Sequence, residues 1–85
     1  MINEITALRR KIIYRSHKRG FLESELIFRK FITQSLIKLR KQELKLLDLL
    51  LSYDDTQIIH WIHKKEIPPK NLESLIETIN NNIKS

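Results

Sequence analysis

Residues 22–51 read LESELIFRKFITQSLIKLRKQELKLLDLLL, and this stretch decides the fold class. Its apolar residues recur every three or four positions, which is the period of an α-helix with one buried face. The stretch contains neither glycine nor proline, so the pattern alone allows a single helix of about 45 Å. A domain of this size is too small for such a rod. We therefore expect two helices, over 22–38 and 41–51, with a break near Leu39–Lys41.

The flanking segments also predict helices rather than strands. Asn3 is a favourable N-cap residue ahead of a first helix over 4–18. Two further helices are expected over 55–64 and 71–83, and Pro68-Pro69 between them prevents one from continuing into the other. The sequence thus predicts an all-α chain, a compact bundle of five helices with short connections.

Composition narrows the class of protein. The 85 residues form a single domain and contain no cysteine, which excludes a disulfide or a thiolate metal site. No segment has the roughly 18–20 consecutive apolar residues of a membrane span, and the N-terminus lacks the layout of a signal or transit peptide. The formal net charge of +6 favours acidic partners. We expect a cytoplasmic protein of bacterial type that is a monomer when free.

The single glycine, Gly20, lies between the first two predicted helices in the sequence Arg19-Gly20-Phe21-Leu22-Glu23. Glycine between two helices predicts a left-handed turn that ends the first of them. Such a turn would present Arg19 and Glu23 together at an exposed corner, where binding residues concentrate. The residues alone favour a structural interpretation, in which both charges complement helix dipoles, over a binding site.

Other candidate chemistry is weak. His60 and His63 stand three residues apart, but a metal site needs a third or fourth ligand, so we expect two surface histidines. The sequence has no phosphate-binding glycine loop or nucleophile motif, so we do not expect an enzyme.

The basic first helix leaves two alternatives open. One is a small nucleic-acid-associated or antitoxin-like regulator, and the other is an interaction module for some acidic protein. The helix after Gly20 begins with Phe21, Leu22 and Glu23 rather than with polar base-reading residues, which argues against sequence-specific DNA binding. We therefore do not expect nucleic acid to be the partner.

The segment YRSHKRGFLE, residues 14–23, resembles the signature of the succinate dehydrogenase assembly factor 2 family, the small flavinylation factors of bacteria and mitochondria. The family motif is Arg-Gly-x-x-Glu, and Arg19, Gly20 and Glu23 match it. A glycine that is frequent in the family after Trp61 is absent. The likeness runs from about Leu8 to Ile79 and includes, in family-like order, Asp48, Asp54-Asp55, Trp61 and Pro68-Pro69.

The resemblance implies a five-helix protein that binds the flavoprotein subunit of succinate dehydrogenase, or of the related fumarate reductase. There it promotes covalent attachment of FAD to a histidine of that subunit. The FAD belongs to the partner, so this chain is expected to bind no cofactor and no metal itself.

The resemblance also implies a partner-binding site around the motif. Arg19 would make a bidentate contact to a partner carboxylate or to carbonyl groups, and Glu23 would accept a hydrogen bond. Gly20 would let the two surfaces approach closely, and Phe21 would be the apolar anchor. The full set of expected partner-binding residues is Arg19, Gly20, Phe21, Glu23, Tyr14 and Arg15.

Overall fold

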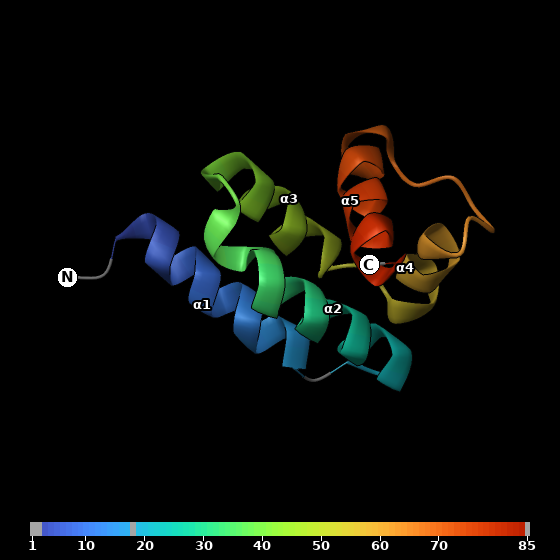
Figure 1. Ribbon diagram of the computed structural model, residues 1–85, viewed down its shortest axis with the longest axis horizontal. Helices are drawn as coiled ribbons and strands as arrows, with labels where there is room; N and C mark the ends of the chain where they lie inside the picture. Colours follow the sequence, from blue (N-terminus) through green and yellow to red (C-terminus); the bar gives the residue numbers. More distant parts are fainter. Residues whose placement is uncertain (1–2, 18, 85) are drawn as a thin grey trace.

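Helices account for the regular structure of the computed structural model, which describes residues 3–17 and 19–84 (Figure 1). Within these ranges there is no strand, which confirms the all-α prediction. Two short 3₁₀ helices also occur, η1 (Leu36–Lys38) and η2 (Lys70–Leu72). The α-helices are α1 (Glu4–His17), α2 (Leu22–Ser35), α3 (Lys41–Leu50), α4 (Asp55–Ile62) and α5 (Glu73–Lys84).

The break between α2 and α3 lies where it was expected. Leu39 and Arg40 have extended backbone angles, and the backbone N–H of Arg40 donates to the Glu43 carboxylate over 2.9 Å, which starts α3. The molecule measures 43 × 25 × 24 Å, so an unbroken helix of about 45 Å over 22–51 would exceed its longest dimension. At the other end of the chain, Asn3 caps α1 by accepting the Thr6 N–H over 2.7 Å. The predicted end of the first helix at Lys18 lies outside the described residues.

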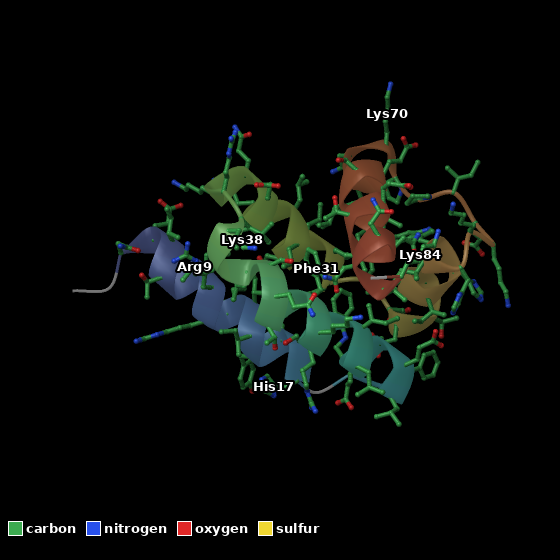
Figure 2. All side chains as sticks on the ribbon, viewed as in Figure 1. Arg9, His17, Phe31, Lys38, Lys70 and Lys84 are labelled. Atoms are coloured by element: carbon green, nitrogen blue, oxygen red, sulfur yellow. The ribbon has the colours of Figure 1, made fainter. Side chains whose placement is uncertain are left out.

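The helices pack around one apolar core. α1 and α2 run side by side as an antiparallel pair, α3 packs on α1, and α5 contacts α2, α3 and α4 (Figure 1). Phe28 and Phe31 of α2 are completely or almost completely buried, and Phe31 points into the middle of the molecule (Figure 2). Trp61 is 5% exposed and packs edge to face on Tyr53.

The end of α4 carries the one left-handed residue among the non-glycine residues described. Lys64 has φ 61°, and it follows the C-cap residue of the helix. The Lys64 N–H donates to the Trp61 carbonyl over 3.2 Å and the Lys65 N–H to the His60 carbonyl over 2.8 Å, which together form a Schellman motif. The position suits glycine, and a side chain there costs about 1–2 kcal/mol. Lys64 lies among the residues after Trp61, the stretch in which the family resemblance implies a glycine.

Candidate functional site

The turn between α1 and α2 is held by a single carboxylate from α4. Oδ1 of Asp55 accepts from Nε and Nη2 of Arg19, over 2.7 and 2.6 Å. Oδ2 of the same carboxylate accepts from the backbone N–H groups of Gly20 and Phe21, over 2.5 and 3.1 Å. Asp55 therefore fixes the side chain and the backbone of the motif at once. From the sequence, Asp55 was noted only among the residues in family-like order, and this role was missed.

The Arg19 guanidinium lies inside the protein. Besides Asp55, it donates to the carbonyl oxygens of Leu51 over 2.9 Å, Tyr53 over 3.1 Å and Arg15 over 3.3 Å. Its side chain is only 9% exposed. The expectation that Arg19 stands on an exposed corner is therefore wrong. Its forked donors are already matched to acceptors of this chain, as is usual for a buried arginine.

The predicted left-handed conformation at Gly20 is also wrong. No described glycine has a positive φ. The turn is held instead by the Asp55 carboxylate, which accepts hydrogen bonds from two consecutive N–H groups. In a left-handed cap, such N–H groups would donate to carbonyl oxygens of the last helical turn. A Cβ added at Gly20 would lie 3.5 Å from Asp55 Oδ2, an ordinary contact. Gly20 itself is exposed.

Two opposing effects act on the pKa of Asp55. Burial raises the pKa, but hydrogen bonds from the Phe21 N–H and from Arg19, the Arg19 charge and the Ser24 hydroxyl together outweigh it. The net result is a pKa held below the usual value of an aspartate. The carboxylate is therefore ionised at neutral pH, as the contact with Arg19 requires.

A lowered pKa in the folded state makes stability depend on pH. Asp55 contributes stability above the pKa of an unfolded aspartate, about 4, and this contribution is lost as the pH falls through its lower folded pKa. Asp55→Asn keeps the shape but cannot ionise. We expect the difference in unfolding free energy between wild type and Asp55→Asn to shrink between pH 6 and about pH 3, measured by urea unfolding with circular dichroism. A difference that stays constant over this range would contradict the assigned role.

The other end of the motif faces solvent. Phe21 is 46% exposed, and the Glu23 side chain is 51% exposed and lies 2.7 Å from His63 Nε2. Leu22 and Leu26 of the same helix are 68% and 52% exposed. We call Phe21, Leu22, Glu23 and Leu26 the motif face. Leu22 and Leu26 also follow a helical spacing, but the buried face of α2 runs through Ser24, Phe28 and Phe31, so the two leucines lie on another face of the helix.

Tyr14 and Arg15 occupy different surroundings from the motif face. Tyr14 is 72% exposed, but it lines a hollow on α1 that shares no residue with the hollow beside Phe21. Arg15 donates to the Asp48 carboxylate over 2.7 Å, and Lys11 lies 3.1 Å from the other oxygen of that group. One carboxylate of α3 therefore contacts two of the cations of α1.

The two histidines of α4 and its C-terminus do not share a site. His60 Nδ1 lies 3.4 Å from Glu66, whereas His63 contacts Glu23. Over residues 3–17 and 19–84, no three potential metal ligands come together.

Comparison with known proteins identifies the family of this chain. The family model described as flavinator of succinate dehydrogenase matches residues 10–83, which is most of the chain. The chain belongs to this family. A flavinator-family relative in Dictyostelium discoideum, the mitochondrial succinate dehydrogenase assembly factor 2, is 40% identical over 73 residues, which is 86% of this chain and 52% of the relative. A relative in Legionella pneumophila (strain Lens), FAD assembly factor SdhE, is 34% identical over 64 residues, 75% of this chain and 81% of the relative.

Coverage differs between these flavinator-family relatives. The chain spans about half the length of the Dictyostelium protein, and 61% of the Caenorhabditis elegans mitochondrial assembly factor, to which it is 33% identical over 84% of its own length. No solved structure matches the chain. Among the described helices, none has the length and apolar character needed to cross a bilayer.

Proposed function

We propose that this chain binds the flavoprotein subunit of succinate dehydrogenase, or of fumarate reductase, and promotes covalent attachment of FAD to it. Family membership supports this function, as do relatives named for succinate dehydrogenase assembly and FAD assembly. The observation that carries the proposal is the arrangement of the motif. One end is fixed from inside by Asp55, and the other end exposes Phe21 and Glu23.

The motif face suits binding to a protein. Phe21 and the neighbouring Leu22 and Leu26 offer apolar area around a carboxylate, and aromatic anchors of this kind carry much of the energy of an interface. Glu23 accepts a hydrogen bond from a donor of the partner in place of His63. Because the turn is already held by Asp55, little backbone ordering remains to be done on binding, which favours affinity.

The role we propose is not catalytic. A helper raises the yield of flavin linkage if it binds more tightly to the arrangement of the partner in which FAD and the acceptor histidine can react. This needs a shaped surface and no reactive group. In this scheme the FAD is held by the partner, and Arg19, Tyr14 and Arg15 act by shaping or flanking the surface rather than by touching the cofactor.

We also propose that the free protein is a monomer in a bacterial-type cytoplasm. The formal net charge of +6 opposes self-association. The Legionella relative is named without an organelle, whereas the Dictyostelium relative is named as mitochondrial.

Glu23→Gln is expected to lower covalent flavin on the partner about tenfold, the effect of losing roughly 1.4 kcal/mol from one charged contact. The variant should fold normally, because the Glu23 side chain is 51% exposed. The measurement is in-gel flavin fluorescence of the flavoprotein subunit after co-expression with each variant. The matched control is Glu4→Gln, which removes another exposed carboxylate with a cationic partner, Lys41 at 2.7 Å. Equal flavin with both variants and wild type would contradict the placement of Glu23 at the partner.

A further inference from the structure

A groove lies beside the motif face, and its lining comes from the start of α2, the end of α4 and the C-terminal half of α5. It has a volume of about 490 Å³. Its lining includes Leu26, Ile62, Lys64, Asn80, Ile83 and Lys84. We call it the α2–α5 groove. Glu23 and His63 line it as well, so the groove continues the motif face without a gap.

Apolar side chains form much of the groove. Leu26 and Ile83 are 52% and 38% exposed, while Ile62 is 4% exposed. Apolar area that remains open to water in a hollow gains free energy when a second apolar surface covers it. The groove therefore suits an apolar side chain of a partner.

Asn80 provides a polar feature of the groove that the fold does not use. It is 8% exposed, and its side chain has no hydrogen-bond partner among residues 3–17 and 19–84. A carboxamide offers donors and an acceptor together, so it pairs with the C=O and N–H of an extended peptide. The polar atoms of Asn80 are not among the buried atoms that lack a partner, so they reach the water in the groove, and the backbone of a bound peptide would replace that water.

Two lysines, Lys64 and Lys84, line the groove together with one carboxylate, that of Glu23, which lies 2.7 Å from His63. Lys64 is also the left-handed residue at the end of α4, where glycine would fit without strain. Backbone strain that a protein retains is typical of positions whose side chain has a function. The two ammonium groups favour a carboxylate on the occupant. A second copy of this chain is disfavoured, because both copies carry a net charge of +6.

We infer that the α2–α5 groove receives an extended segment of the flavoprotein subunit that carries an apolar side chain and a carboxylate. This inference rests on the proposed function and adds to it a second contact, beside the motif face. The apolar side chain covers Leu26 and Ile83, the peptide backbone pairs with Asn80, and the carboxylate lies between Lys64 and Lys84.

The test measures the dissociation constant of the purified flavoprotein subunit for wild type and five variants, of which Glu23→Gln reports on the motif face. Ile83→Asp and Lys64→Glu, both in the groove and outside the motif face, are each expected to weaken binding at least tenfold. Lys64→Gly should weaken binding severalfold while it keeps or raises the melting temperature, because glycine relieves the left-handed strain. Lys70→Glu is the control, since Lys70 projects from the opposite end of the η2–α5 segment from Lys84 (Figure 2). It should bind like wild type.

The outcomes separate this inference from the proposed function. One outcome overturns the inference alone: wild type binds, Glu23→Gln weakens binding, and the three groove variants bind like wild type. The groove is then not a contact, and the proposed function stands. If wild type does not bind the flavoprotein subunit, the proposed function fails and the occupant of the groove fails with it. A photoreactive residue at position 83, which lines the groove but lies outside the motif face, should crosslink to an acidic, apolar stretch of the subunit. Crosslinking to a second copy of this chain instead would overturn the inference.

Discussion

Asp55→Ala is expected to lower the free energy of unfolding by about 3–5 kcal/mol, the usual cost of removing one partner of a buried ion pair. The substitution leaves the Arg19 guanidinium inside the protein without its carboxylate, at a side chain that is 9% exposed. It also removes the acceptor for the N–H groups of Gly20 and Phe21. Urea unfolding followed by circular dichroism measures the loss, and a thermal scan should show a melting temperature lower by more than about 10 °C.

The neighbouring aspartate provides the control for this prediction. Asp54 is exposed and makes no capping hydrogen bond with its side chain, so Asp54→Ala should change stability by less than about 0.5 kcal/mol. Similar losses for Asp54→Ala and Asp55→Ala would mean that the start of α4, and not the contact with Arg19, sets the stability.

Arg19→Ala is expected to cost about 3 kcal/mol of stability. The Asp55 carboxylate keeps two backbone donors in this variant, but the carbonyl groups of Leu51 and Tyr53 lose theirs. Because both side chains serve one network, the double variant Arg19→Ala/Asp55→Ala should lose less than the sum of the single losses, by about 1–3 kcal/mol. Additive losses in this double-mutant cycle would show that the two side chains do not depend on each other.

Covalent flavin attachment in cells should also depend on the stability of the factor. Arg19→Ala is expected to reduce covalent flavin on the partner in proportion to the fraction of the factor that is unfolded. Growth at a lower temperature should therefore recover much of the flavin for Arg19→Ala and little of it for Glu23→Gln, which stays folded at both temperatures. In-gel flavin fluorescence at two growth temperatures makes the comparison.

Much of the fold could be predicted because its signals are local. The apolar period marks the helices, Asn3 marks the start of α1, and Pro68-Pro69 separates α4 from α5. The break before α3 has only a weak local signal, so its prediction depended on the size of the domain. The start of α5 differs from the expected residue 71, because η2 occupies residues 70–72.

The buried position of Arg19 could not be predicted, because it depends on a contact between residues that are distant in the sequence. Arg19 and Asp55 are 36 positions apart, and a charged residue beside a lone glycine is most simply interpreted as exposed. The same distant carboxylate makes a left-handed Gly20 unnecessary. The available signal was the order of residues shared with the family, in which Asp54-Asp55 accompanies the motif.

The groove was also beyond the sequence analysis, although two weak signals pointed to it. Asn80 interrupts the apolar face of α5, where Ile76 and Ile79 are buried. The family resemblance implies a glycine in the stretch after Trp61, and the left-handed Lys64 lies in that stretch. Neither signal locates a groove until α2, α4 and α5 are packed together.

The account rests on a division of the motif, in which Arg19 holds the turn from inside and Glu23 meets the partner. The most direct test is the affinity of Arg19→Lys for the flavoprotein subunit, measured at a temperature where circular dichroism shows the variant to be fully folded. The account predicts an affinity within about threefold of wild type, while Glu23→Gln loses about tenfold under the same conditions. A folded Arg19→Lys that loses as much affinity as Glu23→Gln would place the guanidinium at the interface and contradict the account.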